Sequence, residues 1–110
     1  IRRVARIGDG WMPLFKSMEK GSRSSQSSID PNTAFERLHH ELAVAGRDLS
    51  SIGIECRITS EHSTPDDWRQ QFELFRALGA SHVCLVTAHE TFQGVDAHLD
   101  ALIRMKSALR

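Results

Sequence analysis

The feature that most constrains this chain is the alternation of helix and strand signals along it. Segments with helical apolar spacing take turns with short apolar runs, and this order favours parallel strands joined by crossover helices. The 110 residues allow one domain at most, and they are few for an enzyme barrel. We therefore expect an α/β fold with a single domain over residues 1–110.

The apolar pattern predicts four helices and three strands. The expected helices cover residues 1–7, 31–45, 65–78 and 95–110, and the expected strands cover residues 10–13, 52–58 and 83–86. Ile1, Val4 and Ile7 share one face of the first helix, and Gly8 can end it in a left-handed conformation. The run 83–86 is apolar throughout, as is typical of a strand covered on both faces, so we expect it to be the most central strand.

Capping residues mark two helix starts. Asp30 can accept hydrogen bonds from free amides, and Pro31 suits the first helical position because it has no amide to satisfy. Thr64 and Pro65, with Asp67 three residues beyond the threonine, form the second start signal. The expected buried stripes are Phe35, Leu38, Leu42 and Ala45 in the earlier helix, and Trp68, Phe72, Phe75 and Leu78 in the later one.

One segment of the chain is expected to be mobile. Residues 16–28 are rich in serine and nearly free of large apolar side chains, so burial cannot offset their ordering entropy. We predict a mobile loop there.

The chain opens with Ile rather than Met, in a helix already under way, which indicates a fragment or a processed chain.

Charge and hydropathy narrow the possible partners. Fourteen basic and fourteen acidic residues give a net charge of zero, so we expect no nucleic-acid partner and no membrane partner. No apolar run approaches the roughly 18 residues of a membrane-spanning helix, and residues 1–8 lack the apolar core of a signal peptide. We expect a cytoplasmic protein in which Cys56 and Cys84 are reduced and act as small hydrophobic side chains.

Three stretches resemble one family in their order and spacing. Residues 3–13 contain an alanine-arginine pair at a helix end followed by aspartate-glycine-tryptophan, as is common in luciferase-like monooxygenases. Residues 41–52 are similar to the next unit of that family, in which alanine-glycine-arginine-aspartate precedes an isoleucine-led strand. Residues 78–83 resemble the entrance to its last strand. The chain departs from the family at Leu49, where proline is usual, and in the serine-rich segment 16–28.

This resemblance implies the last three βα units of a (β/α)8 TIM-type barrel, incomplete because the first five strands are absent. It implies a parent oxidoreductase that acts on a small-molecule substrate with FMN or coenzyme F420, a deazaflavin, as its cofactor. The family's phosphate-gripping glycine pair also precedes the helix that opens this chain. We therefore expect the chain alone to be inactive, and to associate with itself as a homo-oligomer or with the missing barrel part.

The candidate cofactor-binding residues follow the expected strands, because barrel enzymes place their chemistry at the carboxyl ends of strands. Trp11 can stack on a flavin ring or can simply pack the barrel. Arg57 can pair with a phosphate, or it can be a surface cation on the same strand face as Glu55. Thr87 and His89 follow the last strand, and His89 can donate to the flavin or be a solvated loop residue.

Other chemistries find less support in the sequence. His39 and His40 are adjacent on one helix and diverge by about 100°, so we expect no metal site from them. Neither a phosphate-cradling glycine loop nor a nucleophile elbow occurs. Two alternatives stay open, namely a catalytically silent truncated barrel module that associates with itself or another chain, and a small α/β ligand-binding domain.

Overall fold

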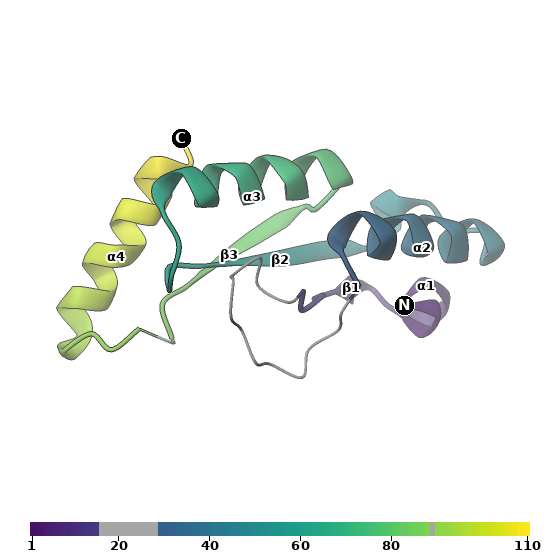
Figure 1. Cartoon of the computed structure of the whole chain (residues 1–110). Helices are drawn as coiled ribbons and strands as arrows, with labels where there is room; N and C mark the ends of the chain where they lie inside the picture. The colour runs from purple at the N-terminus through teal and green to yellow at the C-terminus, as the bar shows by residue number, and fades with distance from the viewer. Residues whose placement is uncertain (16–28, 89) are drawn as a thin grey trace.

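The computed structural model describes residues 1–15, 29–88 and 90–110, which form a three-stranded parallel sheet and four α-helices (Figure 1). The helices are α1 (Arg2–Ile7), α2 (Pro31–Val44), α3 (Pro65–Leu78) and α4 (Gly94–Ala108). The strands are β1 (Gly10–Trp11), β2 (Gly53–Thr59) and β3 (His82–Val86), and a short 3-10 helix, η1 (Leu49–Ser51), precedes β2. The α/β class is thereby confirmed, and the loop predicted over residues 16–28 lies outside the described residues.

The strand order corrects one prediction. β2 lies between β1 and β3 and pairs in parallel with both. The apolar strand β3 is therefore at an edge of the described sheet, and the prediction that it is the most central strand is wrong. Its four apolar residues are half-buried, because α4 packs against one face of β3 while the other face has no cover among the described residues.

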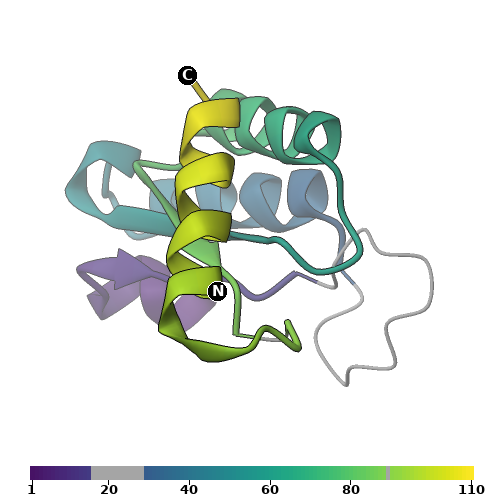
Figure 2. The same cartoon turned by 90° about the vertical axis from the view of Figure 1, so that its left-hand side faces the viewer.

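The core lies between the sheet and the helices on one of its faces. α2 and α3 both lie on that face (Figures 1 and 2). Ile54, Cys56 and Ile58 of β2 point into it and are fully buried, so the predicted alternation of this strand is confirmed. The buried helical side chains around them are Phe35, Leu38 and Leu42 from α2, Trp68 and Phe75 from α3, and Met105 from α4. The opposite face of β2 carries Glu55 and Arg57.

Hydrogen-bonded caps begin α2 and α3 as predicted. Asp30 accepts bonds from the Thr33 hydroxyl and, at 3.3 Å, from the Thr33 N–H. Thr64 and Asp67 form a capping box at the start of α3. In it the Thr64 N–H donates to the Asp67 carboxylate at 2.7 Å, and the Asp67 N–H donates to the Thr64 hydroxyl at 3.3 Å. These bonds favour the charged carboxylates, and they hold the pKa of Asp30 and of Asp67 below its usual value.

Two helix ends differ from the predictions. Gly8 is extended, with φ −80° and ψ 147°, so the predicted left-handed cap is wrong; the chain passes directly from α1 into β1. A side chain would still not fit, because a Cβ on Gly8 would lie 2.9 Å from the Val4 carbonyl oxygen. Ala45 was expected in the buried stripe of α2 and is exposed, because the helix ends at Val44, while Ala34 is buried.

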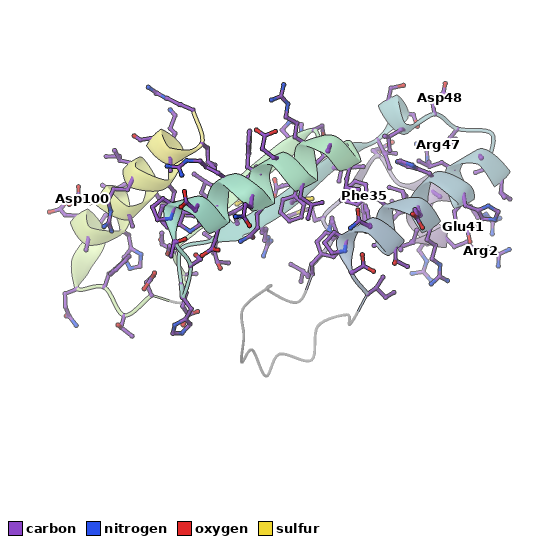
Figure 3. The ribbon with its side chains drawn as sticks, turned by 45° about the horizontal axis from the view of Figure 1, so that its top comes forward. Arg2, Phe35, Glu41, Arg47, Asp48 and Asp100 are labelled. Atoms are coloured by element: carbon purple, nitrogen blue, oxygen red, sulfur yellow. The ribbon has the colours of Figure 1, made fainter. Side chains whose placement is uncertain are left out.

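One side chain fastens α1 to the segment that precedes β2. The Arg47 guanidinium donates to the carbonyl oxygen of Ala5 at 3.1 Å and to that of Gly8 at 2.8 Å, and it lies over this end of the molecule in Figure 3. Carbonyls at a helix end have no partner within the helix, so these bonds satisfy groups that burial would otherwise leave unpaired. The Gly53 N–H donates to the Asp9 carbonyl at 2.9 Å, and this bond begins the pairing of β1 with β2.

A second arginine fastens α4 in a similar way. The Arg69 Nε of α3 donates to the Ala108 carbonyl at the end of α4, at 3.0 Å. Ala101 and Met105 are the buried residues of α4. Val95 and Leu99, whose spacing supported the prediction of this helix, are exposed.

We expect Arg47→Ala to lower the free energy of unfolding by about 2 kcal/mol, because hydrogen bonds from a charged donor typically contribute about 1.5–3 kcal/mol. Urea denaturation followed by circular dichroism measures this change. The matched control is Arg37→Ala on the exposed side of α2, which should change the same quantity by less than about 0.5 kcal/mol. Equal effects of the two substitutions would show that the Arg47 bonds do not stabilise the fold.

Candidate functional site

Polar side chains gather where β2 and β3 end. The Ser60 N–H donates to the Val86 carbonyl at 3.0 Å, and the Ser60 hydroxyl donates to Glu90 Oε1 at 2.8 Å. The Glu90 N–H in turn donates to the Thr87 carbonyl at 3.1 Å. Thr87 Oγ1 lies 2.8 Å from His98 Nδ1. We call Ser60, Thr87, Glu90 and His98 the strand-end cluster, because its bonds join the carboxyl ends of both strands to α4.

The packing of α4 carries His98 into the strand-end cluster. His98 lies three residues before Ala101 and seven before Met105, so it shares the side of α4 that faces the core. Its imidazole also contacts the Phe92 ring edge-on, with centroids 5.1 Å apart. The hydroxyl of Thr87 and the aromatic ring thus orient the imidazole, as a group that binds a polar ligand requires.

The loop between β2 and α3 borders the strand-end cluster. The Trp68 indole N–H donates to the Ser63 hydroxyl at 2.6 Å, and that hydroxyl donates to the Thr59 carbonyl at 2.7 Å. His62 has a left-handed φ of 52°, a conformation that residues other than glycine seldom adopt. It lies 3.4 Å from the carboxylate of Glu61. These contacts hold a tight turn beside the strand-end cluster.

The structure separates the residues predicted from the sequence. Thr87 belongs to the strand-end cluster, and Arg57 is exposed on the uncovered face of β2. Trp11 faces the helices instead, with its ring centroid 5.4 Å from that of Phe35 in an edge-on contact. This contact agrees with the interpretation of Trp11 as a packing residue, and a contact between Trp11 and a cofactor stays a prediction. His89 lies outside the described residues.

Sequence reasoning missed His98, Ser60 and Glu90. His98 did carry a signal, because it falls at helical spacing on the same face as the apolar residues that α4 buries. Ser60 directly follows a strand, and this placement alone makes it a candidate in a parallel sheet. No local pattern marks Glu90, whose role depends on how the chain folds back after β3.

A separate cavity of about 480 Å³ lies beside β3, between α3 and the end of α4. Phe72, Val83 and Leu85 give it apolar walls, and Arg76 and Lys106 are among its basic lining residues. Both helices end near it, so these cations offset the partial negative charge of two helix C-termini. Parallel α/β sheets bind ligands beyond the carboxyl ends of their strands, and this geometry favours the strand-end cluster over the cavity.

The two cysteines mark the two faces of the sheet. Both are free, and Cys56 is fully buried under the helices. Burial raises the pKa of the Cys56 thiol to about 11, with a smaller contribution from the charge of Glu55. Cys84 lies opposite Arg57 in the strand register, and it is half-buried on the uncovered face. Over residues 1–15, 29–88 and 90–110, no three His, Cys, Asp or Glu side chains are grouped to hold a metal ion.

Comparisons with known proteins identify no family for this arrangement. No protein-family model matches the chain, and no curated protein or solved structure matches it. In the described part of the chain, no helix is both long and apolar enough to cross a membrane. The functional interpretation therefore depends on the geometry of the site itself.

We expect iodoacetamide at pH 8 to alkylate Cys84 at least about tenfold faster than Cys56, because only an accessible thiolate reacts. Burial and the raised pKa both keep Cys56 in its unreactive thiol form. Mass spectrometry of the two cysteine peptides over time measures the ratio of rates. In denaturant the ratio should fall close to one, and a ratio near one in the native chain would mean that the uncovered face is not the accessible one.

Proposed function

We propose that this chain is the C-terminal part of a luciferase-like oxidoreductase that uses FMN or a deazaflavin coenzyme. The observation that carries the proposal is the arrangement of β1, β2 and β3, which lie side by side in chain order and in parallel, with α2 and α3 on one face. Consecutive βα units of a barrel have this arrangement. A doubly wound sheet instead reverses its strand order and carries helices on both faces.

In the proposed (β/α)8 barrel, the uncovered face of the sheet lines the interior. Arg57 of β2 and Cys84 of β3 lie opposite each other on that face, and Glu55 lies two residues before Arg57. The three described strands would be the last three of the barrel, and strands supplied from elsewhere would pair with the free edges of β1 and β3. The strand-end cluster then lies at the barrel mouth, where enzymes of this fold carry out their chemistry.

The residues present fit part of a flavin-type cofactor. Arg57 offers an exposed guanidinium that forms no ion pair with another described residue, so it is available to an anionic group. Thr87 and His98 offer hydrogen-bonding groups for the cofactor ring or for the substrate. The cofactor supplies the hydride chemistry when bound, and these side chains bind and orient it. Without the phosphate-gripping glycines of the family, we expect binding by this chain to be weak.

A second candidate function is a catalytically silent module that associates with itself or another chain. The observation that favours it is the set of exposed apolar side chains on α4, which include Val95, Leu99 and Ile103. Helix faces of this kind commonly lie in interfaces between proteins. Association and catalysis are distinguishable, because the strand-end cluster and the exposed side of α4 use different residues.

Titration of the chain with FMN and with the deazaflavin, followed by ring fluorescence, tests the oxidoreductase proposal. We expect saturable binding with a dissociation constant of roughly 100 µM, since only part of the cofactor finds partners. Arg57→Ala should weaken binding at least about tenfold, because a charge-assisted hydrogen bond contributes about 1.5 kcal/mol or more. Arg37→Ala, which removes an exposed charge from α2, should leave binding unchanged.

Two outcomes would count against this proposal. The first is no binding of either cofactor to the folded chain at concentrations near 1 mM, which is about tenfold above the expected dissociation constant. The second is binding that Arg57→Ala and Arg37→Ala weaken equally, because general charge would then explain the affinity without any contribution from the uncovered face.

A further inference from the structure

The outer side of α4 carries large apolar side chains that the described residues leave uncovered. Val95, Leu99 and Ile103 are 72%, 49% and 62% exposed, whereas Ala101 and Met105 on the inner side are buried. In Figure 2, α4 lies in front of the other elements, and no other described helix or strand crosses its outer side. An exposed apolar stripe along a helix is typical of an interaction surface.

Four exposed residues form a line along this outer side, namely Asp96, Leu99, Ile103 and Lys106, and we call it the outer seam. They are separated by three, four and three residues, which is the spacing of the contact positions in a coiled coil. With 3.6 residues in each turn, all four lie within about 80° of the helix circumference. The outer seam is apolar in its centre, acidic at its beginning and basic at its end.

The order of these groups selects an antiparallel second copy of the same helix. A two-fold axis beside Ala101 places Leu99 of each copy opposite Ile103 of the other. The same register places Asp96 of each copy opposite Lys106 of the other, so the apolar contacts and the charged contacts agree on one alignment. A parallel pair would instead bring Asp96 next to Asp96 and Lys106 next to Lys106, and these like charges would repel.

The flank of the outer seam repeats the same order of charges. Asp100 points away from the body of the molecule in Figure 3, and Arg104 follows one helical turn later. An acid before a base on one helix is complementary only to the reverse order on a facing helix. The flank therefore favours the antiparallel arrangement as well.

We propose that α4 is a dimerisation helix whose outer seam pairs antiparallel with the outer seam of a second copy of this chain. The contact is isologous, so two copies close on each other and leave no further outer seam exposed. The proposal does not depend on the oxidoreductase assignment, because it uses no residue of the strand-end cluster or of the uncovered sheet face.

Sedimentation equilibrium of the whole chain from about 1 to 500 µM tests this proposal, and we expect a dimer with a micromolar dissociation constant. Ile103→Glu should raise that constant at least about 50-fold, because two-fold symmetry places one new carboxylate in each of the two Leu99–Ile103 contacts. The matched control is Val44→Glu on α2, where the native side chain is 71% exposed. It should change the constant by less than about twofold. Circular dichroism verifies that each variant is folded.

A charge exchange tests the register without depending on the apolar variant. Asp96→Lys and Lys106→Asp should each weaken the dimer about tenfold, because each substitution places two like charges opposite each other at both ends of the contact. The double variant restores opposite charges at both ends, and its dissociation constant should return to within about threefold of the native value. A monomer at all concentrations, a dimer that Ile103→Glu and Val44→Glu affect equally, or a double variant that stays weak would each overturn the proposal.

Discussion

The guanidinium of Arg47 fixes the first part of the fold. α1 has six residues and β1 has two, so neither is stable by its own local interactions. Both are held by partners about forty residues away in the chain: α1 by the bonds from Arg47 to the carbonyls of Ala5 and Gly8, and β1 by its pairing with β2, which the Gly53–Asp9 bond begins. The placement of β1 against β2, and with it the packing of Trp11 on Phe35, depends on these contacts.

The sequence predicted those elements in which neighbouring residues decide the conformation. The capping box of Thr64 and Asp67 and the alternation along β2 are settled within a few residues, and both are confirmed. The conformation of Gly8 was predicted wrongly because it depends on the direction in which the chain leaves α1 to enter β1, and the residues around Gly8 do not set that direction. The position of β3 in the sheet was predicted wrongly. An apolar run indicates that its side chains favour burial, but it does not indicate how many strands lie beside it.

The sequence likewise predicts some residues of the candidate site and not others. Thr87 was predictable because it follows a strand, and the carboxyl ends of parallel strands meet at one edge of the sheet. His98 reaches Thr87 from eleven residues further along, and only the packing of α4 brings the two side chains within 2.8 Å. The direction of Trp11 depends on its register opposite Ile54, whose side chain points toward the helices. Such pairings are long-range, and the local pattern does not contain them.

The two proposals place different demands on the surface of this small domain. Barrel closure requires strands at the free edges of β1 and β3 and covers the charged face that carries Glu55 and Arg57. Burying those charges is favourable only if they find partners, so this face is suited to a polar interior or to an anionic ligand. The outer seam has an apolar centre that gains stability when water is removed from it. Because dimerisation through α4 leaves both sheet edges free, a dimer of complete barrels is compatible with everything that the strand-end cluster requires.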